Sequence, residues 1–201
     1  CFPPDSPYRV LDGLGRDLPS LLEDPGCRTY LREQQLPLWQ DVPLTATTLP
    51  QLRLYYLRLG FLASGYINQI GQPPVQHLPT NIAVPLVRAC QRLQRRPILS
   101  YDGYALFNWK RFRKDGPIAL GNIDTLQNFV HLYDEHWFIL VHVEIEALAS
   151  HLLSAVTRIQ EALIEKNEDN LNAALTIIAE TVGRQVEVLR RIPEKMSPEL
   201  Y

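Results

Sequence analysis

The pattern that most constrains the fold is a pair of long helical segments in the second half of the chain. Residues 134–166 are largely apolar at first and become amphipathic later. After the polar turn Asn167–Asn170, apolar residues recur at intervals of three and four up to Leu189. That spacing places apolar side chains on one face of a helix, and Pro193 cannot continue the second one. The sequence therefore predicts an antiparallel helical hairpin built to pack into a bundle.

The first half should contain shorter helices, because thirteen of the sixteen prolines lie in the first hundred residues and proline interrupts helices. We expect residues 1–47 to be mostly irregular. Thr48 and Asn81 are predicted to cap the helices that begin near them. Helices are predicted at 16–22, 27–34, 48–68, 82–94 and 125–129. The predicted apolar stripe of the helix 48–68 is Leu52, Tyr55, Leu59, Leu62 and Tyr66. The residues predicted to face inward in the helix 82–94 are Leu86, Val87, Cys90 and Leu93. The predicted fold class is all-α, with a small N-terminal helical domain at 1–120 and the start of a larger helical bundle at 121–201.

Composition excludes several classes of function. The net charge of −2 argues against an electrostatic nucleic-acid binder. Three widely spaced cysteines predict neither a disulfide framework nor a zinc site, and they favour a reducing compartment. No uninterrupted apolar run reaches the roughly 18 residues of a membrane span, and no signal peptide pattern is present. We expect a cytoplasmic protein with no membrane or nucleic-acid partner.

The stretch Trp137–Ala147 is the most informative for function, because it places His142 in an almost wholly apolar helix. Phe138 lies one turn before this imidazole and Glu146 one turn after it, on the same face. A buried polar group without a partner costs about 1–3 kcal/mol, so the ordinary interpretation is a hydrogen bond to a nearby carbonyl. The functional interpretation is a pocket for a flat aromatic ligand, lined by Phe138 and His142.

Two further segments carry weak signals when each is taken alone. Leu78–Pro85 has the composition of a helix start, and Pro97–Trp109 is an aromatic-rich segment typical of a core.

The sequence gives less support to other kinds of catalytic site. No acidic residue precedes a histidine by three positions, as a di-iron bundle requires, and the sequence contains neither a complete Gly-rich phosphate loop nor a Gly-x-Ser-x-Gly elbow.

In this order and spacing, the three segments resemble the indoleamine 2,3-dioxygenase family. Its members carry motifs similar to Leu-Pro-x-Asn-Ile-Ala-x-Pro, Pro-Ile-Leu-x-Tyr…Asn-Trp and Trp-Phe…Glu-Ala, and the resemblance covers residues 50–190 approximately. It implies an all-α fold in which a small helical domain caps a large one. It also implies haem b (Fe²⁺) as the cofactor, and insertion of O₂ across the indole C2–C3 bond of L-tryptophan to give N-formylkynurenine.

The resemblance assigns site residues one by one. Tyr101 falls on the family's distal-pocket tyrosine, and Tyr104 and Ala105 fall on two further positions of the pocket wall. Phe138 falls on the pocket phenylalanine that packs against the indole. His142 stands where the animal enzymes have serine. There the pattern Phe-x-x-x-His-x-x-x-Glu is similar to the tryptophan 2,3-dioxygenases, whose histidine accepts a hydrogen bond from the indole N–H. His142 is therefore the predicted catalytic residue.

The family's proximal haem histidine and its carboxylate-binding arginine come after the second hairpin helix, so we expect both beyond Tyr201. We accordingly expect this chain to be a fragment, inactive by itself, with apolar surface exposed on its hairpin. Two alternatives stay open. The bulk of Tyr104 favours a related haem enzyme that acts on a different indole. A non-enzymatic helical ligand-binding or scaffold protein could use the same fold.

Overall fold

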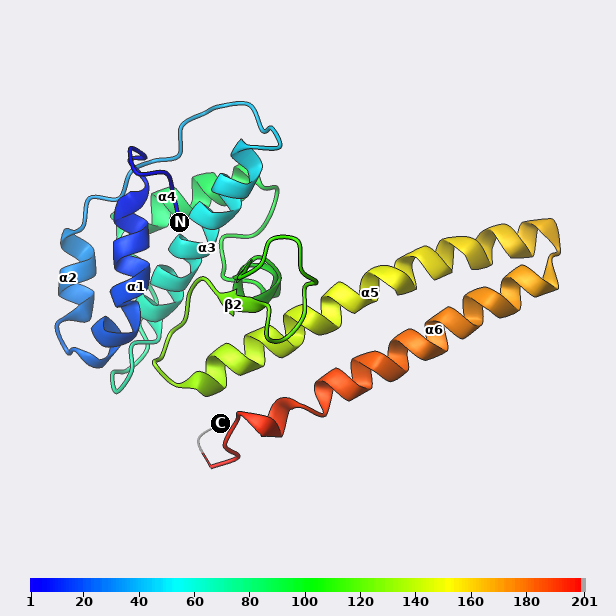
Figure 1. Ribbon diagram of the computed structural model, residues 1–201. Helices are drawn as coiled ribbons and strands as arrows, with labels where there is room; N and C mark the ends of the chain where they lie inside the picture. The colour runs from blue at the N-terminus through cyan, green and yellow to red at the C-terminus, as the bar shows by residue number, and fades with distance from the viewer. Residues whose placement is uncertain (200–201) are drawn as a thin grey trace. The chain divides into compact units, whose positions relative to one another are not determined.

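Helices dominate residues 1–199, which are the residues that the computed structural model describes, and the predicted all-α class is confirmed (Figure 1). The chain divides into two compact units. One consists of Cys1–Asn108 with Thr125–Glu135, and the other of Trp109–Asp124 with the chain from His136 onward. The division between a domain at 1–120 and one at 121–201 stays a prediction about the domains of a whole enzyme.

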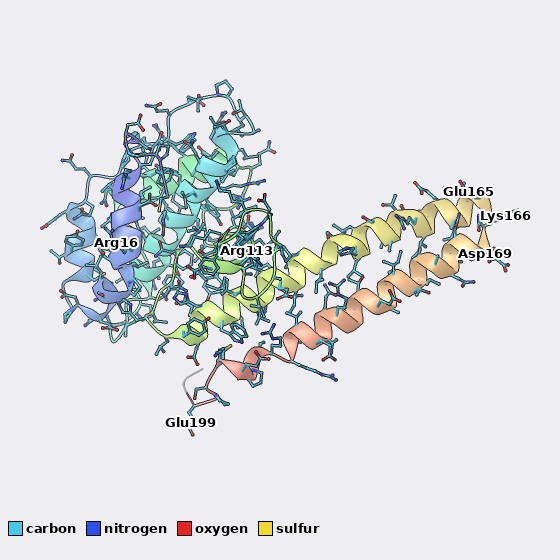
Figure 2. The ribbon with its side chains drawn as sticks, in the orientation of Figure 1. Arg16, Arg113, Glu165, Lys166, Asp169 and Glu199 are labelled. Carbon is cyan, nitrogen blue, oxygen red and sulfur yellow. The ribbon has the colours of Figure 1, made fainter. Side chains whose placement is uncertain are left out.

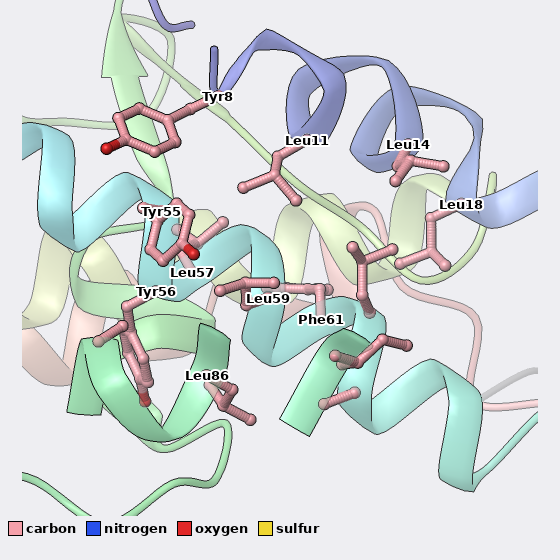
Figure 3. Close-up of a cluster of buried hydrophobic side chains, with 14 of the residues drawn as sticks. Tyr8, Leu11, Leu14, Leu18, Tyr55, Tyr56, Leu57, Leu59, Phe61 and Leu86 are labelled. Atoms are coloured by element: carbon pink, nitrogen blue, oxygen red, sulfur yellow. The ribbon is translucent and has the colours of Figure 1, made fainter. Parts of the chain in front are cut away.

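The first unit is built around helix α3 (Thr48–Ile67), against which the helices α1 (Arg9–Glu23), α2 (Cys27–Glu33) and α4 (Thr80–Arg92) pack. The centre of α3 is buried on all sides, so it is a core helix and not a surface helix with one apolar stripe. Figure 3 shows its side chains between those of α1 and α4. The apolar stripe predicted for this helix is confirmed as buried: Leu52, Tyr55, Leu59, Leu62 and Tyr66.

The prediction of irregular chain before residue 16 was wrong, because α1 already begins at Arg9. Its buried leucines follow one another at intervals of three, four and four, which is the spacing of a helix face. Three helix-disfavouring residues, Gly13, Gly15 and Pro19, lie among them and mask the pattern. The leucines that form this face are Leu11, Leu14, Leu18 and Leu22.

Gly15 and Pro19 have a structural use in α1. Proline has no N–H to donate to the carbonyl four residues earlier, and here the Gln127 side chain donates to the Gly15 carbonyl instead, at 2.6 Å. A Cβ at Gly15 would collide with the Gln127 amide and the Arg58 guanidinium. Arg58 is itself buried, and it bonds to Asp12, Gln127 and the carbonyl of Leu126. These two helix breakers thus allow a distant loop to dock on α1.

Both predicted caps were wrong in detail. The hydroxyl of Thr45, not that of Thr48, accepts the N–H groups of Thr47 and Thr48 at the start of α3. Asn81 lies inside α4, and its amide donates to the carbonyls of Leu31 and Gln34, at 2.8 Å each, and so ties α4 to the end of α2.

One predicted inward residue of α4 was also misplaced. Val87 is 38% exposed. The buried face of α4 contains Ile82, Leu86 and Ala89, which follow one another at intervals of four and three. Val87 therefore lies one position outside the stripe.

Residues 98–130 contain a short π-helix (Asp102–Leu106) and two three-residue strands, β1 (Trp109–Arg111) and β2 (Ile123–Thr125), which pair with each other. The short helix predicted near residues 125–129 was wrong, because β2 ends at Thr125 and irregular chain follows it. The side chain of Asn108 occupies backbone groups of that segment that a helix would have used.

The predicted hairpin is confirmed in the second unit. Helix α5 (Tyr133–Glu165), whose first turn belongs to the first unit, is followed by α6 (Glu168–Leu189) and a 3₁₀ turn (Ile192–Glu194). Asn167 caps α6 by accepting the N–H of Asn170 at 3.0 Å. Figure 2 shows the connecting turn, with Glu165, Lys166 and Asp169 at its tip. Towards the other end of the hairpin, the Trp137 indole N–H donates to the Arg191 carbonyl.

Buried positions on the hairpin recur at intervals of seven residues, which indicates a coiled-coil type of seam between its helices. They are Leu148, Ala155 and Ala162 on α5, and Ala174, Thr181 and Val188 on α6. The residue after many of these positions is apolar and exposed, as expected from the sequence. The exposed apolar residues that directly follow a seam position have solvent-accessible fractions of 44–59%: Val156, Leu163, Leu175, Val182 and Leu189.

By length and composition, α5 could cross a membrane. The core helix of a globular protein satisfies the same criteria, and part of α5 is buried against α6 and the loop around Leu120. The absence of a membrane partner stays a prediction.

The packing at Gly15 leads to a prediction about stability. We expect Gly15→Ala to lower the free energy of unfolding of the full-length protein by about 1–3 kcal/mol, because the added methyl group overpacks a buried site. Gly13→Ala, two residues away in the same helix with no atom closer than 3.8 Å, should raise it by about 0.4–1 kcal/mol. Calorimetric unfolding checks both, and shifts of the same sign would contradict this packing.

Candidate functional site

The first group of predicted site residues lies on the π-helix Asp102–Leu106 and on Tyr101, which directly precedes it. A single π turn is uncommon and is found at functional sites more often than elsewhere. Here the N–H of Phe107 bonds to the Asp102 carbonyl, five residues back, at 2.8 Å. Asp102 itself is held by the guanidinium of Arg95 and the hydroxyl of Ser100. The turn is therefore fixed at its N-terminal end by charge-assisted hydrogen bonds.

The three residues that this segment contributes differ in their surroundings. Ala105 is buried, Tyr104 is half-buried, and Tyr101 is 45% exposed. The Tyr104 ring stacks on Phe61 and Phe129, with ring centroids 5.8 and 6.3 Å apart. Tyr104 therefore belongs to an aromatic cluster of the first unit.

Asn108 holds the C-terminal end of the π-helix. Its amide nitrogen donates to the carbonyls of Tyr104 and Gln127, at 2.9 and 2.8 Å, and its amide oxygen accepts the N–H groups of Leu126 and Gln127, at 3.2 and 2.8 Å. The side chain is fully buried. This single amide makes four hydrogen bonds, and it joins the segment with Tyr104 to the loop that follows β2.

Phe138 and His142 form the second group, one helical turn apart on α5. Both are half-buried, and their ring centroids lie 4.2 Å apart. His142 Nδ1 lies 2.7 Å from the Phe138 carbonyl oxygen. A carbonyl can only accept, so Nδ1 carries the proton, and in the neutral ring Nε2 is left as an acceptor. The sequence-based expectation of a carbonyl partner for this histidine is confirmed.

The other histidines have different surroundings. His136 lies 3.9 Å from the Asp124 carboxylate; burial lowers the pKa of His136, and Asp124 opposes that shift. His131 bonds to the Ser20 hydroxyl, and Nδ1 of His151 bonds to the Leu148 carbonyl. Within residues 1–199, no three histidine, cysteine or acidic side chains form a cluster that could hold a metal ion.

Each unit brings together its own members of the predicted site. Tyr101, Tyr104 and Ala105 belong to the first unit, and Phe138 and His142 belong to the second. That all five face one pocket stays a prediction.

Glu135 is a residue that the sequence interpretation did not single out. It is 2% exposed and accepts the N–H groups of Phe129 and Val130 at 2.8 and 2.9 Å. Burial raises the pKa of Glu135, while those N–H groups oppose the shift. A glutamate at the third position of a helix reaches back to backbone N–H groups in the capping box, so its place in α5 was a usable signal. Asn108 is the asparagine of the Asn-Trp motif, and the sequence alone predicts no role for it.

Comparison with known proteins identifies the family. A family model described as indoleamine 2,3-dioxygenase matches residues 4–201. The chain belongs to the indoleamine 2,3-dioxygenase family. Indoleamine 2,3-dioxygenase 1 of Rattus norvegicus is 30% identical over 199 residues, which cover 98% of this chain and 48% of the relative. The indoleamine 2,3-dioxygenase of Saccharomyces cerevisiae is 32% identical over 202 residues, covering 96% and 44%.

A relative named for a different substrate also matches. The 6-hydroxytryptophan 2,3-dioxygenase of Fusarium equiseti is 25% identical over 198 residues, covering 98% of this chain and 48% of the relative. The chain spans about half the length of the curated relatives it matches.

The four hydrogen bonds of Asn108 lead to a prediction. We expect Asn108→Asp to lower the free energy of unfolding by about 3 kcal/mol or more. The carboxylate keeps the acceptors but loses both donors, so the carbonyls of Tyr104 and Gln127 are left buried and unpaired. Thermal unfolding measures the loss, and a change within about 0.5 kcal/mol of zero would show that these bonds contribute little.

Proposed function

We propose that the whole protein is a haem-dependent dioxygenase that inserts O₂ across the indole C2–C3 bond of L-tryptophan or a related indoleamine, giving N-formylkynurenine. Membership of the indoleamine 2,3-dioxygenase family supports the class of reaction. The observation that carries the assignment within this chain is the geometry of His142. Its ring lies against Phe138, and the bond from its Nδ1 to the Phe138 carbonyl makes Nε2 the acceptor nitrogen of the neutral ring.

The residues of this chain fit the substrate side of a haem pocket. Aromatic rings and an imidazole acceptor suit a flat indole with one N–H donor. Haem, when bound, supplies the activation of O₂. A haem iron also needs an axial side chain, commonly a histidine. We place that ligand, together with an arginine for the substrate carboxylate, in the part of the family's length that this chain does not span.

In this proposal each residue of the chain has a limited task. Phe138 packs against the indole ring, and Tyr104 and Ala105 line the pocket wall together with Tyr101. His142 Nε2 accepts the indole N–H and so fixes the rotation of the ring in the pocket. Placement and exclusion of water are contributions that a protein makes beside a cofactor.

The role of His142 is tested in the full-length holoenzyme. We expect His142→Ala to lower kcat/KM for L-tryptophan by about tenfold or more, roughly 1.4 kcal/mol of transition-state stabilisation. His151 provides a matched control on the same helix, because its Nδ1 also bonds to a backbone carbonyl. His151→Ala should leave kcat/KM within about twofold of the wild type.

A histidine whose other nitrogen bonds to a carbonyl is also suited to bind the haem iron. The haem content of the variant distinguishes that axial role from hydrogen bonding to the substrate. We expect the His142→Ala variant to retain the haem Soret band at the wild-type stoichiometry. Loss of haem would make His142 the ligand, and unchanged kinetics with retained haem would remove it from the site.

Tyr104 favours a second candidate within the same class, a haem enzyme that acts on another indole. The family resemblance places Tyr104 where the better-known animal enzymes have a cysteine, and the tyrosine ring occupies more space than that side chain. The Fusarium relative is named for a hydroxylated tryptophan. We expect turnover across a panel of indoles to be highest for L-tryptophan, and a preference of more than about tenfold for another indole would favour the second candidate.

Lack of haem binding by the full-length protein would favour a non-enzymatic ligand-binding or scaffold role.

A further inference from the structure

Tyr104 is held by hydrogen bonds at its backbone and at its hydroxyl group. At the backbone, its N–H donates to the Ser100 carbonyl at 2.9 Å, and its carbonyl accepts the Asn108 amide at 2.9 Å. At the far end, its hydroxyl donates to Glu135 Oε1 at 3.4 Å. Between these two ends, the ring stacks on Phe61 and Phe129, with interplanar angles of 22° and 20°.

The Glu135 carboxylate is itself fixed. It lies in the first turn of α5, where the helix dipole favours a negative charge. Two backbone N–H groups, those of Phe129 and Val130, bind its oxygens at 2.8–3.1 Å. A buried carboxylate with this many donors cannot change rotamer without leaving N–H groups unpaired. It is therefore a rigid acceptor for the Tyr104 hydroxyl, and all of these residues belong to the first unit.

We propose that Glu135 is a positioning residue that holds the Tyr104 ring as a fixed wall of the indole pocket, so that the enzyme discriminates against indoles substituted on the ring. This inference rests on the proposed function. A Tyr104 ring that cannot change rotamer leaves no space for a methyl group added to the indole ring of the substrate. One such group in a shaped apolar pocket changes kcat/KM by about 10–200-fold. When the hydroxyl or its acceptor is removed, the ring loses its hydrogen bond to Glu135 and can move more easily, so the penalty for the larger substrate falls.

The measured quantity is the ratio of kcat/KM for L-tryptophan to kcat/KM for 5-methyl-L-tryptophan, in the full-length holoenzyme. This ratio is independent of the amount of active enzyme, so a loss of stability alone does not move it. We expect Glu135→Gln and Tyr104→Phe each to lower the ratio by about threefold or more. The same ratio taken from dissociation constants, measured by titration calorimetry without O₂, should move in the same direction.

The double variant tests whether Glu135 acts through Tyr104. If it does, Glu135→Gln in the Tyr104→Phe background changes the ratio no further.

Glu144 is the matched control, since it lies on the same helix and its carboxylate also accepts a backbone N–H, that of Leu120 at 2.7 Å. We expect Glu144→Gln to leave the ratio unchanged.

The outcomes separate the two proposals. An unchanged ratio in Tyr104→Phe, or a further fall in the double variant as large as that in Glu135→Gln alone, overturns the positioning role while the dioxygenase assignment stands. If Glu135→Gln does not fold, Tyr104→Phe alone decides. A wild-type holoenzyme that turns over neither substrate overturns the proposed function, and this inference falls with it.

Discussion

The first unit depends on one buried amide, that of Asn108. By bonding to Tyr104, Leu126 and Gln127, it fixes the loop after β2 against the π-helix. The Gln127 side chain of that loop donates to the Gly15 carbonyl of α1. The backbone N–H groups of Phe129 and Val130, in the same loop, donate to the Glu135 carboxylate. Each of these groups is buried or half-buried, so a missing partner would cost about 1–3 kcal/mol. Tyr104, the N-terminal helix and the first turn of α5 are thus coupled through one loop.

The sequence predicted the elements whose side chains repeat with a helical period. The helix beginning at Thr48 and helix α5 were found in this way, within one residue of their observed bounds. Helix α6 was also found, although it begins at Glu168, inside the predicted turn 167–170. Helix α1 was found only in part, because Gly15 and Pro19 disfavour a helix locally, and their compensation comes from Gln127, more than a hundred residues away. The same kind of distant partner, the side chain of Asn108, explains why residues 125–129 are not helical. Local patterns contain no information about such partners.

The candidate site shows a similar limit. The apolar surroundings of His142 predicted that its imidazole must have a partner, and the structure supplies the Phe138 carbonyl. The ordinary and the functional interpretations turned out to be compatible, because a neutral imidazole has two nitrogens with different roles. Tyr101, Tyr104 and Ala105 came from resemblance and had no physical signature of their own. Glu135 could have been found from its place in the first turn of α5, but its bond to Tyr104, 31 residues earlier in the chain, has no local signal.

The proline in α1 has a consequence for how the protein can be dissected. An ordinary helix satisfies its interior carbonyls by itself, but α1 leaves that of Gly15 to a side chain that follows β2. The four N-terminal helices, although contiguous in the chain, are therefore chemically incomplete without residues 125–135. A truncation at residue 108 would expose an unpaired carbonyl and the buried Arg58 together, so the smallest cooperative folding unit must include a segment that lies beyond the β-hairpin.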